Sequence, residues 1–333
     1  MVLIDSTPIR QRVMQSAVIN EKSGLSVLSF QAMGTVCRVS LVETDRGQAN
    51  KYVQALLDWV ADFEAKYSRF LEGSLISQIN RAAGTEWVRI DEETERLLAM
   101  CHELRFFTQG VFEPTALPLI KLWNWKSNPP KLPDETDIET ARDLVGWNKI
   151  QRKPGAIFLP RHGMSLDLGG IGKEYAVDHV AQMAGAFGIE NVLVDFGQDI
   201  RAVGRPPGKP AWHVGLEDPK QPGNCWASVA ATGVAVATSG DYLRHFVIGG
   251  KRFGHIIDPR TGYPVDNGCS SVTVVAPSCT LAGILTTTAF ILGPKEGYEL
   301  IQRSFGASGA ISTTKNRLIT PRFNEHLVQI LQN

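Results

Sequence analysis

The organisation of the chain is set by the segment Gly254-His255-Ile256-Ile257-Asp258-Pro259-Arg260-Thr261-Gly262-Tyr263-Pro264. A short apolar run that carries a histidine ends in Asp-Pro, and Pro259 biases Asp258 away from the helical region. Gly262 permits a positive φ angle. We therefore expect a strand that ends in a turn, with the polar side chains of His255 and Asp258 held at its end.

Both flanks of this segment favour the same organisation. Upstream, residues 238–242 are typical of a turn of small residues between two strands. Downstream, residues 271–276 predict a buried strand, after which Pro277-Ser278 opens a helix that reaches Gly293. Because the first amides of a helix lack backbone partners, a strand, a turn and a helix N-terminus together often build an anion site. A hairpin followed by a packing helix explains the same spacing.

Length, composition and charge exclude several classes of protein. The chain has 333 residues, of which 43% are hydrophobic, so it can bury a large core. Lys+Arg and Asp+Glu each number 34, which gives a net charge of zero, so nucleic-acid binding by bulk charge is not expected. The five cysteines have no paired spacing, which argues against a disulfide framework or a zinc site.

Periodicity along the chain predicts groups of strands with helices between them. Residues 1–24 show no clear period and are expected to form an N-terminal arm, followed by a single domain over residues 25–333. Strands are expected at residues 25–30, 35–42, 191–197, 212–216, 227–231, 234–237 and 271–276, and helices at residues 53–67, 91–110, 136–144, 176–187, 277–293, 298–305 and at the C-terminus. This order indicates α+β layers and not strict alternation.

A patterned Gly-rich segment precedes the predicted helix at residues 176–187. It reads Asp167-Leu168-Gly169-Gly170-Ile171-Gly172-Lys173-Glu174-Tyr175. Glycines before a helix let the backbone approach a ligand closely, and phosphate is the usual ligand. The segment is not a Walker loop, because Lys173 lacks a following Ser or Thr, and no GxGxxG precedes a βαβ unit as in a Rossmann fingerprint.

Seven short motifs follow one another in a defined order. They are Met33-Gly34-Thr35, Ser68-Arg69-Phe70, residues 110–115, residues 167–173, residues 238–242, residues 255–262 and residues 282–287. Together they resemble the motifs of the FAD:protein FMN transferases of the ApbE type, over roughly residues 30–293. The resemblance implies an α+β, T-fold-like domain with layers of antiparallel sheet and helices.

The resemblance also implies a reaction. FAD is cleaved at its pyrophosphate, FMN is attached through its phosphate to a Thr or Ser hydroxyl of a partner flavoprotein, and AMP is released. Such a phosphoryl transfer needs the pyrophosphate charge neutralised and the hydroxyl deprotonated and placed in line. The expected cofactors are FAD, as substrate, and Mg²⁺. Two alternatives are a non-catalytic FAD-binding homologue and an FAD pyrophosphatase that yields FMN and AMP.

Carried onto this chain, the resemblance places the site as follows. The FAD contacts fall at Met33, Phe70, Val111, Phe112, Glu113, Gly169, Tyr175 and Ile257. Magnesium would be bound by the backbone carbonyl of Gly172, at position 283 and by the hydroxyl of Thr287, since oxygen ligands suit this ion. His255 is the candidate general base, because an ordinary histidine pKa of about 6.5 suits proton transfer near neutral pH.

Each of these residues also has a structural interpretation. His255 could be a strand histidine that is hydrogen-bonded for structure, and Thr287 a β-branched residue that packs inward. Glu113 could serve only to stabilise a turn, and Tyr175 only to fill the core. The sequence leaves both interpretations open for all four.

One departure from the family pattern bears on the metal. The pattern has Asp where this chain has Gly283, and Gly where this chain has Glu174. The anionic side chain expected on the metal is thus absent, so metal affinity should fall unless the phosphates, Glu174 or Asp199 compensate. Gly283→Asp is expected to tighten magnesium binding, unless Glu174 already supplies the charge.

The sequence contains no apolar segment as long as a membrane span. The N-terminal residues have no hydrophobic core of the length that a signal peptide needs. As written, the sequence therefore predicts a cytoplasmic protein without a membrane span. A periplasmic location is the alternative, because many relatives are exported.

Overall fold

The computed structural model describes all residues except 1–3, 23, 44, 125, 128, 243 and 329–333. A nine-stranded sheet forms its centre, and neighbouring strands all run antiparallel. In spatial order the strands are β1 (Val18–Lys22), β2 (Leu25–Ala32), β3 (Thr35–Leu41), β7 (Val192–Phe196), β8 (Asp199–Val203), β11 (Ala235–Gly240), β16 (Cys269–Ala276), β17 (Ser308–Thr313) and β18 (Arg317–Ile319). The predicted α+β fold with an antiparallel sheet is confirmed.

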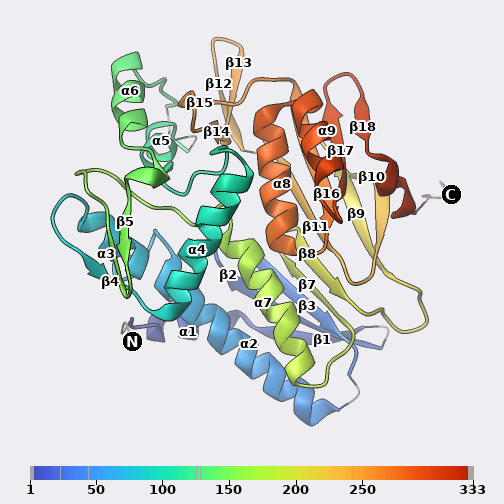
Figure 1. Cartoon of the computed structure of the whole chain (residues 1–333). Helices are drawn as coiled ribbons and strands as arrows, with labels where there is room; N and C mark the ends of the chain where they lie inside the picture. Colours follow the sequence, from blue (N-terminus) through green and yellow to red (C-terminus); the bar gives the residue numbers. More distant parts are fainter. Residues whose placement is uncertain are drawn as a thin grey trace.

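Helices cover one face of this sheet (Figure 1). They are α2 (Arg46–Tyr67), α7 (Gly172–Ala186), α8 (Cys279–Leu292) and α9 (Pro294–Arg303), and each packs on one or more of the strands. Val272 and Val274 of β16 point into the apolar core on this side. Because side chains alternate along a strand, Val275 points into a second core on the other face.

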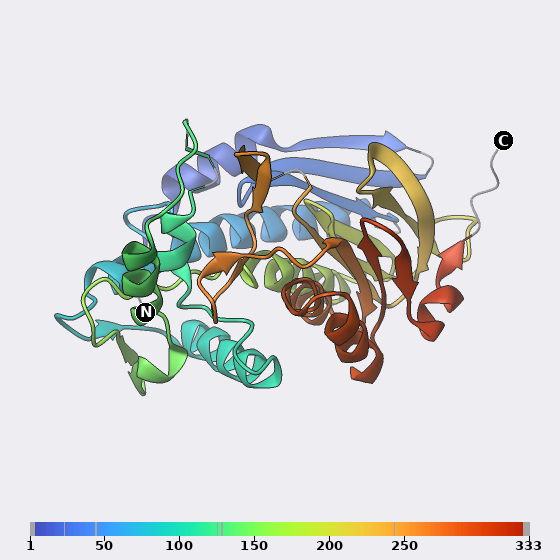
Figure 2. The ribbon, with the colours of Figure 1, turned by 90° about the horizontal axis from the view of Figure 1, so that it is seen from above.

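A smaller sheet covers part of that other face. It consists of β19 (Leu327–Val328), β10 (Gln221–Ala231) and β9 (Trp212–Asp218). Figure 2 shows β9 and β10 on the side of the large sheet away from α8 and α9. Phe323, in a 3-10 helix (Pro321–Glu325), is fully buried in the core between the two sheets. The central strands are therefore apolar on both faces.

The remaining elements lie at one end of the molecule, beside the helical layer (Figure 1). They include α3 (Leu75–Arg81), α4 (Glu92–Phe107), α5 (Leu117–Leu122), α6 (Glu135–Asp143), a 3-10 helix (Trp147–Lys149), β4 (Val88–Arg89), β5 (Gln151–Lys153) and β6 (Ala156–Phe158). Two hairpins complete this part. The first pairs β12 (His245–Ile248) with β13 (Lys251–Gly254), and the second pairs β14 (Ile257–Asp258) with β15 (Tyr263–Pro264). The indole nitrogen of Trp123 donates to the carbonyl of Gly262 at 2.7 Å, which fastens the second hairpin to α5.

Three local predictions are wrong. The expected N-terminal arm contains α1 (Thr7–Ser16) and β1, and β1 pairs with β2 at the edge of the large sheet. The turn expected at residues 238–242 begins later, because β11 continues to Gly240. The expected C-terminal helix is replaced by the 3-10 helix and β19, and its last residues, 329–333, lie outside the described residues. In each case packing against distant strands decides the local structure.

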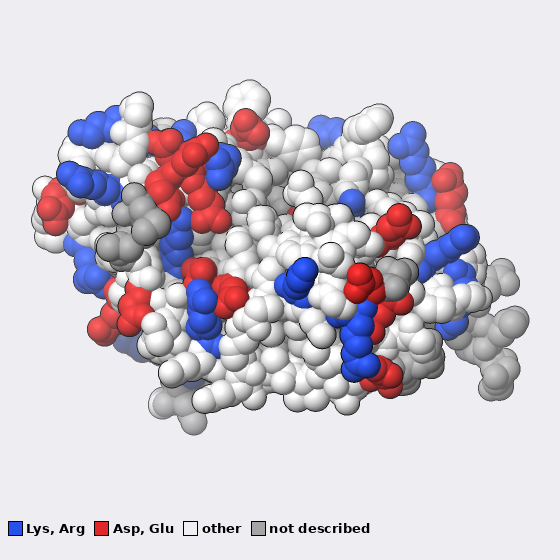
Figure 3. All heavy atoms as spheres, turned by 90° about the horizontal axis from the view of Figure 1, so that it is seen from below, with Lys and Arg blue, Asp and Glu red and all other residues white. Residues whose placement is uncertain are grey.

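The surface carries charges of both signs, in line with the equal numbers of acidic and basic residues. On the face shown in Figure 3, basic and acidic side chains are interspersed. Among the helices that the structure describes, none combines the length and the apolar character that crossing a membrane requires.

A side chain of α7 holds the beginning of α8. The carboxylate of Asp178 accepts hydrogen bonds from the backbone nitrogens of Cys279 (2.7 Å) and Thr280 (2.8 Å), and from the Thr280 hydroxyl (2.8 Å). These amides belong to the first turn of α8, where they have no helical partners and carry the positive end of the helix dipole. The contact sets an antiparallel register in which Glu174, one turn before Asp178, faces Gly283, one turn after Cys279.

We expect Asp178→Ala to lower the free energy of unfolding by about 2 kcal/mol, because it leaves the first amides of α8 without a charged acceptor. Asp178→Asn should cost less, since the amide oxygen still accepts a hydrogen bond. Chemical denaturation measures both values. Glu299→Ala, which removes an exposed acid of α9, is the matched control. A loss for Asp178→Ala no larger than for this control would contradict the role of the contact.

Candidate functional site

Two loops that the sequence assigns to FAD are joined by an ion pair. The Nε of Arg69 lies 3.0 Å from Oδ2 of Asp167, and its guanidinium lies over the ring of Phe70, 4.0 Å from the centroid. Oδ1 of Asp167 accepts a hydrogen bond from the backbone nitrogen of Gly169 at 2.9 Å. Phe70 as a residue is 76% exposed. An open aromatic ring therefore stands beside the Gly-rich turn that precedes α7.

The loop at residues 111–115 meets the same turn. A Cβ atom at Gly170 would lie 3.6 Å from the ring of Phe112, and the carbonyl of Pro114 accepts from the backbone nitrogen of Asp167 at 2.8 Å. Val111, the first residue of this loop, is buried. The structure thus brings together the predicted positions Phe70, Phe112 and Gly169, which lie far apart in the sequence.

The carboxylate of Glu113 accepts hydrogen bonds from other groups of the protein. Its Oε1 accepts from the backbone nitrogen (3.1 Å) and hydroxyl (2.6 Å) of Thr115. Its Oε2 accepts from Nε of Arg105 (2.8 Å) and from the backbone nitrogen of Trp147 (3.3 Å). With four hydrogen bonds, this carboxylate has the turn-stabilising role that the sequence left open. A contact between residue 113 and FAD stays a prediction.

Two further predicted FAD residues are held by α2. The backbone nitrogen of Met33 donates to Oε2 of Glu64 at 2.8 Å, and Met33 has a φ of 49°. A positive φ is costly for a residue with a side chain and persists where its surroundings hold it. Tyr175 stacks on Phe63, with 5.6 Å between ring centroids. The ring of Tyr175 is therefore packed as the core interpretation describes, and its FAD contact stays a prediction.

His255 and Ile257 lie where β13 leads into β14. The backbone nitrogen of His255 donates to the carbonyl of Arg244 at 3.0 Å. Ile257 is buried in an apolar cluster with Leu119 and Trp123. Burial and the nearby Arg244 lower the pKa of His255 to about 4. At neutral pH the imidazole is therefore uncharged, which is the form that accepts a proton.

The predicted metal-binding positions lie around α7, α8 and the end of β11. Gly172 is the buried first residue of α7. The hydroxyl of Thr287 lies 3.0 Å from Oγ of Ser239, which also donates to the hydroxyl of Thr286 at 2.9 Å. The Thr287 hydroxyl is thus oriented by a strand residue. Across the described part of the chain, no three His, Cys, Asp or Glu side chains are grouped so that they could hold a metal ion by themselves.

Glu174 fills the space beside Gly283. A Cβ atom at Gly283 would lie 2.6 Å from Cγ of Glu174, closer than real Cβ contacts allow, and 3.0 Å from its Oε1. Any side chain at position 283 must displace Glu174. The structure therefore favours the alternative in which Glu174 already brings a carboxylate here, and Gly283→Asp alone should crowd the site.

Glu174 belongs to a group of three charged side chains. Nζ of Lys173 lies 2.6 Å from Oδ2 of Asp199. Oε2 of Glu174 is buried and has no hydrogen-bond partner among the described residues. Burial, followed by the charge of Asp199, raises the pKa of Glu174 well above its usual range. Asp199 is also hydrogen-bonded to the carboxyl of Glu174, so two acids share one lysine and Glu174 holds its proton more tightly than an ordinary glutamic acid.

Comparison with known proteins places the chain in a family. The sequence model of the ApbE family matches residues 33–311. The chain belongs to the ApbE family. A FAD:protein FMN transferase of Klebsiella pneumoniae is 31% identical over 291 residues, which cover 84% of this chain and 82% of the relative. One of Haemophilus influenzae is 28% identical over 319 residues, or 91% of each chain.

Solved structures agree with this assignment. The crystal structure of the apbe protein from Thermotoga maritima matches the fold with a TM-score of 0.83 at 30% identity, and covers 92% of this chain and 100% of that one. The predicted ApbE-type family and fold are confirmed.

Sequence reasoning missed two residues that position this ApbE-family site. Asp178 was not singled out, although it follows Glu174 by four residues and so lies on the same face of α7. Asp167 was quoted within a motif but given no role, and it joins the loops of Phe70 and Gly169. Their partners are remote in sequence, so spacing alone carries no signal for either contact.

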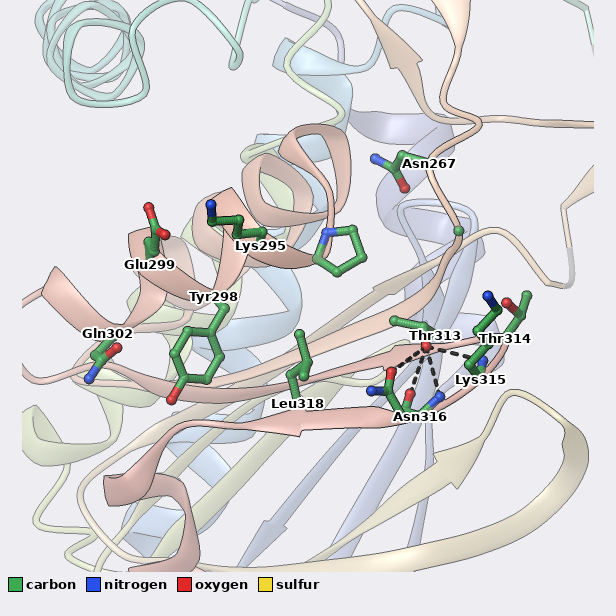
Figure 4. Close-up of a pocket in the computed structure, with 12 residues that line it drawn as sticks. Asn267, Lys295, Tyr298, Glu299, Gln302, Thr313, Thr314, Lys315, Asn316 and Leu318 are labelled. Atoms are coloured by element: carbon green, nitrogen blue, oxygen red, sulfur yellow. Dashed lines mark hydrogen bonds between the residues drawn. The ribbon is translucent and has the colours of Figure 1, made fainter.

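A separate cavity of about 770 Å³ lies between α9 and the turn from β17 to β18 (Figure 4). It is lined by Asn267, Gly268, Pro294, Lys295, Tyr298, Glu299, Gln302, Thr313, Thr314, Lys315, Asn316 and Leu318. None of the residues assigned to FAD or to the metal in the ApbE-type site is among them.

We expect the imidazole of His255 to titrate near pH 4 in the ligand-free protein, as measured by NMR with His255→Gln used for assignment. Because the folded protein binds this proton less tightly than the unfolded chain, unfolding takes up a proton between about pH 6.5 and pH 4. Stability should therefore fall as the pH is lowered through this window, and less so in His255→Gln. A midpoint near 6.5 would show that His255 is not buried as described.

We expect Gly283→Asp to destabilise the protein by about 1–3 kcal/mol, because the new side chain overlaps Glu174 and adds a like charge. In a Glu174→Gly background the same change should cost less, with a coupling of about 1 kcal/mol or more. Denaturation of the parent, both single variants and the double variant gives this coupling. Additive effects would mean that the two side chains do not compete for the same space.

Proposed function

We propose that this chain cleaves FAD and transfers its FMN part to a Thr or Ser hydroxyl of a partner flavoprotein, assisted by Mg²⁺. Flavin-transferase activity accords with membership of the ApbE family. One observation carries the proposal at the level of the site: an open aromatic ring, Phe70, stands beside the Gly-rich turn at the N-terminus of α7. Helix amides bind a pyrophosphate, and aromatic rings stack on the flat rings of a dinucleotide.

The proposed reaction forms one bond and breaks one. The acceptor oxygen bonds to the phosphorus on the FMN side of the pyrophosphate, and the bond from that phosphorus to the bridging oxygen breaks. AMP leaves with that oxygen, and the hydroxyl proton passes to a base. His255 is the candidate base, since its imidazole is uncharged at neutral pH, and its lowered pKa makes it a weaker base than an ordinary histidine in the ligand-free protein. The amides at the start of α7 would orient the pyrophosphate for in-line attack.

The oxygen donors beside α7 and α8 fit a magnesium ion whose coordination is completed by the substrate. Magnesium is commonly bound by one or two carboxylates together with phosphate oxygens and water. The Thr287 hydroxyl, the Gly172 carbonyl and the Glu174 carboxylate are donors of this kind, and Oε2 of Glu174 is a buried oxygen without a partner among the described residues. When bound, magnesium would neutralise charge on the pyrophosphate.

The proposal is tested by incubating the protein with FAD, MgCl₂ and a purified flavoprotein domain that carries a Thr flavinylation motif. The acceptor should gain the mass of one FMN less one water, and AMP should appear in equal amount. An acceptor with that Thr changed to Ala, and a reaction in EDTA, should show neither product. Free FMN and AMP with an unmodified acceptor would indicate a pyrophosphatase, and unchanged FAD a binding protein.

His255→Ala should leave FAD affinity nearly unchanged and lower the rate of transfer by roughly 10²–10⁴-fold, as the loss of a general base typically does. Calorimetry measures the affinity and acceptor mass measures the rate. His213→Ala, at an exposed position of β9, is the matched control. If His255→Ala transfers FMN at the rate of the parent, His255 is not the general base and has only a structural role.

A further inference from the structure

The carboxyl group of Glu174 is buried, and the described residues leave one of its oxygens without a hydrogen-bond partner. We propose that Glu174 supplies the anionic side-chain ligand of the divalent cation at the FAD pyrophosphate, reaching from α7 across the space that Gly283 leaves open on α8. The inference rests on the proposed metal-assisted transfer and deepens it, because it names the residue on which metal binding depends.

The first step is the cost of the buried oxygen. Oε2 of Glu174 is buried and has no hydrogen-bond partner among the described residues. Burying a carboxylate oxygen without a partner costs several kcal/mol as an order of magnitude, so such a group is normally paired, protonated or bound to a metal. Both oxygens of Glu113 accept hydrogen bonds, whereas Oε2 of Glu174 marks a position that a ligand can complete.

The second step is the balance of charge. Lys173, the cation beside Glu174, is engaged by Asp199 at 2.6 Å and also reaches the carbonyl of Gly197 at 3.5 Å. Asp199 also contacts the carboxyl of Glu174, so two acids share this one lysine, and both can be charged only when a further cation is present. A divalent cation would compensate Glu174 and retain one positive charge for the phosphates of FAD. The site therefore suits a cation together with a pyrophosphate better than either ligand alone.

The third step is the fit between the two helices. Gly283 lies in the interior of α8, where glycine costs about 1 kcal/mol relative to alanine. Its lack of a side chain is needed here, because a Cβ atom would lie 2.6 Å from Cγ of Glu174. Thr287 follows Gly283 by one helical turn on the same face. The carboxylate of Glu174 and the hydroxyl of Thr287 therefore border the same side of α8.

The test measures how strongly Mg²⁺ tightens the binding of ADP, a probe that carries the adenosine and the pyrophosphate but no flavin. Calorimetry with ADP is carried out in MgCl₂ and in EDTA. For the parent we expect at least tenfold tighter binding in Mg²⁺. For Glu174→Gln the two affinities should lie within about twofold of each other, with the EDTA value unchanged, since losing a ligand should cost at least the 10–100-fold typical of a supporting residue. Glu299→Gln should behave as the parent.

A second variant distinguishes the loss of a metal ligand from misfolding of Glu174→Gln. Glu174→Gly combined with Gly283→Asp moves the carboxylate from α7 to α8 and should restore at least a tenfold effect of Mg²⁺ on ADP binding. A parent-like Mg²⁺ effect in Glu174→Gln overturns the inference and would mean that Glu174 is held by a proton. If Glu174→Gln also transfers FMN in a Mg²⁺-dependent way, the proposed function remains valid although the inference about Glu174 is wrong. If the parent protein transfers FMN equally well in EDTA, the metal-assisted mechanism and the assignment of Glu174 as a metal ligand are both wrong.

Discussion

The hydrogen bonds that Asp178 accepts from the first turn of α8 determine how the two central helices face each other. α7 begins at the Gly-rich turn, and α8 carries the Thr287 hydroxyl. Fixing one helix against the other therefore fixes the distance between the Gly-rich turn and the hydroxyl groups of Thr286 and Thr287. A helix terminus is a good place for such a contact, because its amides must find an acceptor in any case.

Around this pair, the loops of the site are held mainly by charged side chains that bind within the protein. Arg69 and Asp167 join two loops, Glu113 closes a third with four hydrogen bonds, and Lys173 is paired with Asp199. Such groups orient the backbone and leave amides and aromatic rings to face a ligand. Glu174 differs from them, because one of its oxygens finds no partner in the described structure.

Local patterns in the sequence were sufficient for the elements that carry their own signals. The apolar run with a Ser cap predicted α8, and the glycines predicted a turn ahead of α7. α1 was not predicted, because the stability of a short helix depends on tertiary packing, here of Ile9 and Val13. The pairing of Glu174 with Gly283 could not be read from spacing, since it depends on the register of two helices more than one hundred residues apart in the chain. Composition and motifs thus predicted the family and the loops, while contacts across the core needed the structure.

The turn at Met33 has a consequence for how much of the chain the site requires. Its strained backbone is held by Glu64, and Glu64 is paired with Arg12 of α1 at 2.6 Å. Chain ends usually tolerate trimming, provided that no buried group depends on them. Here the loss of α1 would leave the buried Glu64 carboxylate without its counterion, directly beneath a loop assigned to FAD. A version of the protein that lacks α1 should therefore lose the support of this loop, so the first helix counts among the elements that hold the candidate site in place.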